Sequence, residues 1–127
     1  MRVARIHADA QGESHFGDAD LALEEIALFP RQPLYRAVRF GGANPAKLLI
    51  VPAAVKVHDW HTAPERQLSV AVNGAVEYET SDGEVRRFGP GELVPVEYTR
   101  GRGHITRFCE EEQCFLHIPV PDDWMTT

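Results

Sequence analysis

The sequence predicts an all-β fold of the sandwich or barrel type. Turn residues are frequent, with ten Gly and nine Pro spread along 127 residues and no linker-like cluster. Between them lie short runs rich in β-branched and aromatic residues, and a helical pattern is nearly absent. Short strands separated by regular turns are typical of sandwiches and barrels. A chain of this length predicts one domain, residues 1–127, with a single core.

The expected strands follow one another along the whole chain. Two N-terminal strands, 3–7 and 14–16, are expected around a turn at 9–12. Further strands are expected at 34–40, 48–51, 67–72, 75–79, 84–88, 93–98, 104–108 and 114–118. Ser81-Asp82-Gly83 is the best hairpin turn, and Asn73-Gly74 and Gly89-Pro90-Gly91 are further turns. Only residues 20–28 fit a helix, and they fit an irregular strand as well.

The charge balance bears on which partners are expected. Nineteen acidic and thirteen basic residues give a net charge of −6. An acidic surface repels phosphate backbones, so no nucleic-acid partner is expected. No apolar run approaches the ~20 residues that span a bilayer, so no membrane partner is expected either. The first five residues, Met-Arg-Val-Ala-Arg, lack the apolar stretch of a signal peptide, which predicts a cytoplasmic protein.

The run 67–72 has two different faces. Strand alternation places Leu68, Val70 and Val72 on one side, and Gln67, Ser69 and Ala71 on the other. The apolar side needs cover from another sheet or another subunit. The small polar side suits either a cavity wall or a surface that faces solvent.

Six histidines in a chain of this size raise a metal hypothesis. The notable group is His58-Asp59-Trp60-His61, which is followed by Gln67 and later by His104. Imidazoles and an oxygen ligand that converge from two strands can bind a divalent transition metal. The other histidines are assigned to surface or subunit contacts (His7 and His15) and to a core or edge position (His117).

These residues resemble the motifs of the cupin superfamily. Its first motif runs Gly, five residues, His-x-His, three or four residues, Glu, six residues, Gly. Gly74 matches the closing glycine, Gln67 stands at the glutamate, and His61 lies near one of the histidines. Gly101-Arg102-Gly103-His104 matches the Gly-x-x-His part of the second motif, with Thr99 at its proline and Phe108 at its asparagine. The resemblance covers residues 48–118 and looks like that of small bacterial cupins without an established activity.

The resemblance implies a jelly roll, or double-stranded β-helix barrel, made of two packed antiparallel sheets. Gln67 and Ser69 would face its interior, and Leu68 and Val70 would face outward. The family is usually dimeric, so a homodimer is expected in which the partner covers the outward face. The N-terminal strands within residues 1–29 would contribute to that contact.

The resemblance also implies a metal site, formed here by His61, Gln67 and His104, for Fe, Ni, Zn, Cu or Mn. Family sites use three histidines and a glutamate, so the neutral Gln67 predicts weaker binding. His58 joins the site only if Asp59-Trp60 bulges, because residues three apart on a regular strand point to opposite faces. Whether Glu65 joins stays open. The alternative is a metal-free, hydrogen-bonded polar cluster. Trp60 and Ser69 are expected to line a substrate pocket.

Three functions are compatible with this interpretation. The first is a metal-dependent enzyme, of oxygenase or isomerase type, that acts on a small molecule in the barrel cavity. The second is a metal-free small-molecule binding or sensor protein. The third is a structural homodimer with a vestigial cavity. The sequence names no substrate, because the cupin fold hosts many chemistries.

Two smaller features give specific expectations. Cys109 and Cys114 flank four polar residues, which predicts a hairpin loop with reduced thiols on either side, and whether they ever pair stays open. Arg66 and Arg107 are expected to pair with glutamates on neighbouring strands, namely Glu77, Glu79 or Glu97.

Overall fold

A computed structural model describes residues 1–27, 30–31, 33–37, 46–97, 100–121 and 125–126. The described residues contain thirteen strands and no helix, so none of them forms a helix that could cross a membrane. The strands are β1 Arg2–Ala8, β2 Ser14–Leu21, β3 Glu24–Ile26, β4 Tyr35–Ala37, β5 Lys47–Ile50, β6 Val57–His61, β7 Gln67–Ala71, β8 Val76–Thr80, β9 Val85–Phe88, β10 Leu93–Val96, β11 His104–Phe108, β12 Cys114–Pro119 and β13 Met125–Thr126.

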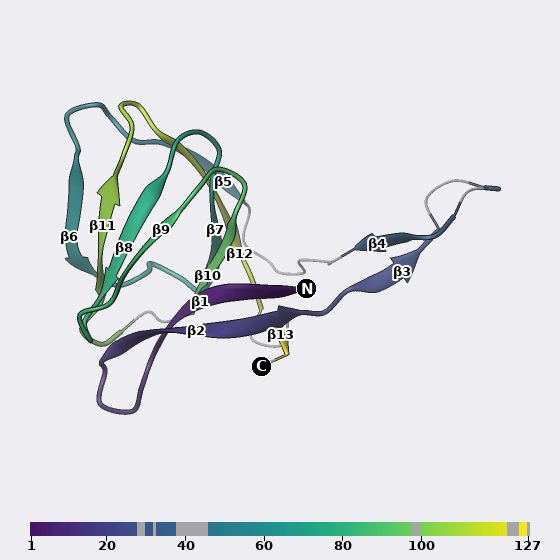
Figure 1. The fold of residues 1–127 in the computed structure, drawn as a ribbon, viewed down its shortest axis with the longest axis horizontal. Helices are drawn as coiled ribbons and strands as arrows, with labels where there is room; N and C mark the ends of the chain where they lie inside the picture. Colours follow the sequence, from purple (N-terminus) through teal and green to yellow (C-terminus); the bar gives the residue numbers. More distant parts are fainter. Residues whose placement is uncertain (28–29, 32, 38–45, 98–99, 122–124, 127) are drawn as a thin grey trace.

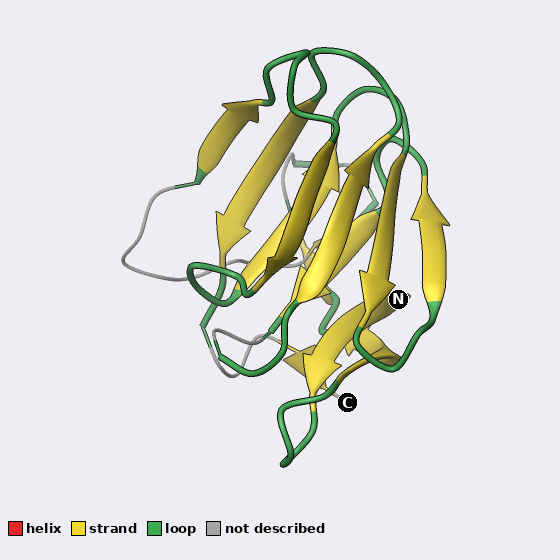
Figure 2. Cartoon of the chain, turned by 90° about the vertical axis from the view of Figure 1, so that its left-hand side faces the viewer, coloured by secondary structure: helices red, strands yellow, loops and turns green. Residues whose placement is uncertain are grey.

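Eleven of these strands form two sheets that face each other as a sandwich (Figures 1 and 2). The large sheet has the order β13-β2-β1-β10-β7-β12-β5, and the small sheet has the order β6-β11-β8-β9. The predicted all-β, jelly-roll type of fold is confirmed. The pairing of β1 with β10, through Ile6 and Val96, is parallel, whereas the other pairs are antiparallel.

The turn chemistry explains how the chain moves within and between the sheets. Ser81-Asp82-Gly83 closes the hairpin of β8 and β9, where Gly83 has a φ of 91° and its N–H donates to the carbonyl of Thr80. Asn73-Gly74 instead carries the chain from the large sheet to the small one, between β7 and β8. Cys109 and Cys114 also flank a crossover between sheets, because β11 and β12 do not pair. The hairpin predicted there is therefore wrong, and both thiols are free.

The main core lies between the sheets. It includes Ile6, Val76, Phe88, Val94 and Phe115, all 9% exposed or less. Gln67 and Ser69 point into this interior and are buried, as the alternation along β7 requires.

A second cluster covers part of the outward face of the large sheet. Leu68 is 1% exposed there and packs with Leu21 and Val120 of the same chain. The expected cover by a partner subunit is thus not needed at Leu68. The N-terminal strands β1 and β2 provide much of this cover as integral strands of the large sheet.

The strand predictions missed β13, and they missed two further described segments for local reasons. Residues 20–27 end β2 and form β3, so the helical alternative for that stretch is wrong. Strand β6 has no regular apolar alternation, because it carries a bulge and is exposed along four of its five residues. The predicted positions 28–29, 38–40, 98 and Thr99 lie outside the described residues.

Candidate functional site

A cavity of about 570 Å³ lies between the two sheets. Most of its wall is apolar and includes Leu49, Val51, Val55, Val96, Phe108 and Phe115. Its polar groups are imidazoles, hydroxyls, one amide and one ammonium, from His58, His61, Thr62, Gln67, Ser69, Tyr78, His104, Thr106, His117 and Lys47. No carboxylate of a described residue lines it. This size and lining are typical of sites for small organic molecules.

A β-bulge on β6 builds the histidine end of the cavity. His104 of β11 pairs with His61 of β6, and Thr106 pairs with His58. The two partners are therefore three residues apart on β6 but only two residues apart on β11. The extra residue lies at Asp59-Trp60. This bulge turns the His58 side chain to the same face of the strand as His61, which a regular strand would not allow. The two imidazoles consequently stack, with ring centroids 3.7 Å apart and planes 9° from parallel.

His104 completes this histidine cluster from the neighbouring strand. Its ring centroid lies 4.4 Å from that of His61 and 5.6 Å from that of Tyr78. Burial, together with the nearby His61 and His58, lowers the pKa of His104 to about 3. His104 is therefore a neutral imidazole at physiological pH.

The backbone of the bulge fixes the tautomer of His61. Its Nδ1 donates a hydrogen bond to the carbonyl of Asp59, at 2.7 Å. Because a carbonyl only accepts, the proton sits on Nδ1, and the Nε2 lone pair of the neutral ring is left unprotonated. Burial lowers the pKa of His61 below its usual value, which favours this neutral form.

Gln67 and the pair Ser69–Tyr78 supply further polar groups. Gln67 is 5% exposed, and its side-chain oxygen Oε1 is buried with no hydrogen-bond partner among the described residues. The Ser69 and Tyr78 hydroxyls lie 3.3 Å apart, and burial raises the pKa of Tyr78. Each buried polar atom without a partner costs stability, so the orphaned Gln67 oxygen is the atom of the cavity wall that most needs one.

The structure places the other expected site residues away from the histidine cluster. Trp60, expected in the pocket, lies outside it and is 47% exposed, because the bulge turns it outward. Glu65 does not line the cavity, and its Oε1 lies 3.6 Å from Nζ of Lys47. Arg107 pairs with Glu79 and Glu77, as predicted, with nitrogen–oxygen distances of 2.7 and 3.6 Å.

Sequence reasoning missed Tyr78 and the cavity role of His117. Tyr78 sits on the inward-facing side of β8, and its alternation with Glu77 and Glu79 was the available signal. His117 lines the cavity from β12, and burial lowers its pKa.

A second cluster joins two turns at the edge of the sandwich. His15 lies between Asp9 and Asp82, with its Nε2 2.7 Å from the first carboxylate and its Nδ1 2.8 Å from the second. Asp9, Glu13 and His15 are the group of described residues whose metal-ligating atoms all lie within 4.8 Å of one another. Both imidazole nitrogens face carboxylate oxygens, which raises the pKa of His15 and favours the protonated ring. We therefore interpret Asp9, His15 and Asp82 as an ion-paired bridge between the two turns, and we call this group the latch.

The residues of the cavity meet some of the requirements of a metal site. Neutral imidazoles suit transition metals, and the Gln67 oxygen offers an oxygen ligand. However, the potential ligand nitrogens of His58, His61 and His104 are not all within 4.8 Å of one another. As they stand, these three imidazoles do not form a compact set of metal ligands. No family model matches this chain, and no curated protein matches it.

Proposed function

We propose that this protein binds a small, mainly apolar organic molecule in the cavity between its sheets. The observation that carries the proposal is the polar end of a mainly apolar cavity, where the buried Gln67 side-chain oxygen has no hydrogen-bond partner among the described residues. The apolar body of the ligand would contact Phe108, Phe115 and Val96. A hydroxyl or N–H group on the ligand would donate to Gln67.

The charges of the cavity narrow the class of ligand. No described carboxylate lines the wall, His104 is neutral, and the one ammonium in the wall, that of Lys47, lies 3.6 Å from Oε1 of Glu65. A cationic ligand would therefore lose its hydration without gaining a counter-ion, which is costly. Neutral molecules with a hydrogen-bond donor, such as phenols, meet the demands of the site.

A set of one- and two-ring phenols, each compared with its methyl ether, tests this proposal. The ether keeps the size and removes only the donor. We expect the wild type to bind its best phenol about tenfold more tightly than the ether, since a lost hydrogen bond to a buried acceptor costs about 1–3 kcal/mol. Isothermal titration calorimetry measures both affinities.

Two substitutions make the test specific. Gln67→Leu removes the acceptor and should abolish the difference between phenol and ether. Gln11→Leu makes the same change at an exposed position and should preserve that difference. A set in which no compound binds, or a difference that survives Gln67→Leu, would contradict the proposal.

A metal-dependent activity is the second candidate, and the bulge of β6 favours it. The bulge brings His58 to the same side as His61, beside His104. His61, His104 and Gln67 would hold the ion, with His58 as a further donor. A divalent ion there would supply Lewis-acid or redox chemistry.

Elemental analysis separates the two candidates. The wild type and His104→Ala are measured after incubation with Fe, Ni, Zn, Cu or Mn and removal of excess ion. A near-stoichiometric metal that is lost in the variant supports the metal-dependent activity. Wild-type protein that stays free of metal rules it out and leaves metal-free binding.

A further inference from the structure

A row of polar side chains crosses the inner face of the large sheet. Strand register places Lys47 of β5 opposite His117 of β12, and His117 opposite Ser69 of β7. All three residues line the cavity. The Tyr78 hydroxyl extends the row to the small sheet, because it lies 3.3 Å from the Ser69 hydroxyl. We call Lys47, His117, Ser69 and Tyr78 the polar row.

The polar row offers hydrogen-bond donors. An ammonium only donates, a neutral imidazole has one N–H group, and a hydroxyl can donate one proton. Burial, followed by the charge of Lys47, lowers the pKa of His117, which favours its neutral ring. The groups at the histidine cluster are acceptors instead, namely the side-chain oxygen of Gln67 and the unprotonated Nε2 of His61. The cavity thus presents acceptors at its histidine end and donors toward Lys47.

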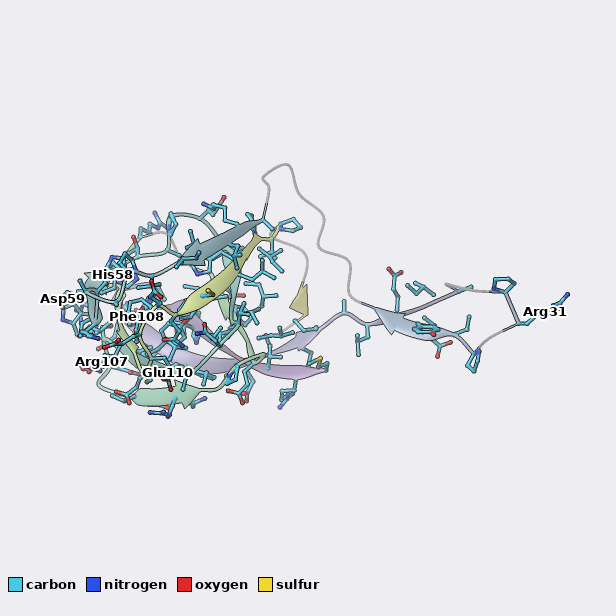
Figure 3. The ribbon with its side chains drawn as sticks, turned by 90° about the horizontal axis from the view of Figure 1, so that it is seen from above. Arg31, His58, Asp59, Arg107, Phe108 and Glu110 are labelled. Atoms are coloured by element: carbon cyan, nitrogen blue, oxygen red, sulfur yellow. The ribbon has the colours of Figure 1, made fainter. Side chains whose placement is uncertain are left out.

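Lys47 gives the polar row a preference for anions. Among the described residues, Lys47 is the only Lys or Arg that lines this cavity. Its side chain is 49% exposed, so its ammonium lies where the cavity meets solvent. Figure 3 shows the cavity residues His58 and Phe108 in the body of the molecule, whereas Arg31 stands at the far tip of the projecting ribbon of β3 and β4. An anionic group on a ligand would therefore find its counter-ion at Lys47.

We propose that the ligand of the cavity carries a carboxylate, which binds Lys47 and the polar row while a donor group at the other end of the ligand binds Gln67. This inference rests on the proposed function, because it concerns the second end of the same ligand. The ammonium of Lys47 lies 3.6 Å from Oε1 of Glu65, and both side chains are partly exposed. Since an exposed ion pair contributes little stability, the ligand carboxylate can take the place of Glu65. The neutral group required at the histidine end is unchanged.

The spacing of the strands sets the length of this ligand. Strand β12 lies between β5 and β7 in the large sheet. Neighbouring strands are about 4.8 Å apart, so Lys47 and Gln67 are separated by about 10 Å across the sheet. One aromatic ring with a hydroxyl at one end and a short alkyl chain that ends in a carboxylate at the other matches this separation. The ligand class is therefore the hydroxyaryl alkanoic acids, and para-hydroxyphenylpropanoate is the probe.

Isothermal titration calorimetry compares this acid with its primary amide, which has the same shape and no charge. We expect the wild type to bind the acid about tenfold more tightly than the amide, because hydrogen bonds between charged groups are the stronger ones. Lys47→Met should remove this preference, and Glu65→Gln should increase it by removing the competing carboxylate. Lys56→Met is the matched control and should keep the preference, because Lys56 pairs with Glu111 at 3.3 Å and does not line the cavity.

The outcomes separate this inference from the function on which it rests. If phenols bind but the wild type binds the acid no better than the amide, the carboxylate site alone is overturned. A preference that survives Lys47→Met, or that does not increase in Glu65→Gln, would overturn it as well. If neither the acid, the amide nor any phenol binds, both proposals fail.

The wild type alone gives a reading if Lys47→Met does not fold. The preference for the acid should shrink as the salt concentration rises, because salt screens a half-exposed ammonium. A preference that is independent of salt would contradict a contact between the carboxylate and Lys47.

Discussion

His104 has a polar ring but is almost completely buried, with 3% of the residue exposed. Burial, together with His61 and His58, holds its pKa at about 3, compared with an ordinary value of 6.5. In the unfolded chain the ring takes up a proton below about pH 6.5, whereas in the folded chain it does so only near pH 3. Folding is therefore opposed progressively as the pH falls between these values, and His104 has no such effect above pH 6.5.

We predict that the His104 ring does not titrate between pH 8 and pH 4 and that His104→Gln is less acid-sensitive than the wild type. Imidazole carbon–proton shifts measured by NMR report the titration. Urea unfolding at about pH 7.5 and pH 5 reports the acid sensitivity. A His104 signal that titrates near pH 6.5 would contradict the buried, neutral ring.

Gly103 shows how a single backbone position sets the histidine cluster. It has a φ of 81°, and a Cβ placed on it would overlap the backbone of His61 on β6. The chain needs glycine here because strand β11 begins directly against the bulge. The carbonyl of Gly103 also accepts a hydrogen bond from the Ser14 hydroxyl, at 2.8 Å.

We predict that Gly103→Ala lowers the free energy of unfolding by at least about 2 kcal/mol, because strain at positive φ adds to the overlap. Gly89→Ala is the control, since a Cβ there meets no atom within 4 Å. Chemical denaturation compares the two variants. Equal stability of both would show that β6 does not press on Gly103.

At the scale of elements, two turns are joined across the edge of the sandwich. His15 bridges Asp9, in the turn between β1 and β2, and Asp82, in the turn between β8 and β9. Ser14 and Ser81 reinforce this latch, because the N–H of each donates to the hydroxyl of the other, at 2.6 Å. The latch thereby ties the large sheet to the small one.

The stabilisation that the latch contributes should be lost both at high pH and at low pH, through different groups. The pKa of His15 is raised mainly by Asp9, so its contribution is full below about pH 6.5 and is lost as the pH rises through the folded-state pKa. The pKa values of Asp9 and Asp82 are lowered, so their contribution is lost as the pH falls below about 4. His7, 5.8 Å away between ring centroids, and Glu13, which pairs with Arg102, also face this region.

We predict that amide exchange at Ser14 and Ser81 is slowest near pH 5–6, after correction for intrinsic rates. On the alkaline side the protection should fall, and His15→Gln should remove that alkaline dependence. Hydrogen exchange followed by NMR measures both effects. Protection that is independent of pH in the wild type would show that His15 carries no charge in the latch.

Strands in which apolar and polar residues alternate were predictable from the sequence. The contacts between elements that lie far apart in the sequence were not. Strands such as β7 and β8 were located because their apolar residues repeat every second position. Strand β6 was not, because its bulge breaks that repeat at the residues that form the histidine cluster. The latch was missed for a similar reason, since nothing local in 9–15 or 81–83 shows that those turns meet. His61, Gln67, Ser69 and His104 line the cavity because they lie on inward-facing strand positions.

At the scale of the whole molecule, the two facing sheets enclose a cavity with an apolar body and one polar end. The large sheet supplies Gln67 and Ser69, and the small sheet supplies His61, Tyr78 and His104. Neither sheet alone forms the polar end, so the function proposed for the cavity depends on how the sheets are held together.

The most direct test of this account is a methyl NMR titration of the wild type with the tightest-binding phenol of the set. We predict saturable shifts at cavity methyl groups, above all those of Leu49, Val51 and Val96. The methyl groups of Val85, on the outside of β9, should stay unchanged. Saturable shifts at Val85, with none at Val96, would show that the cavity is not the binding site.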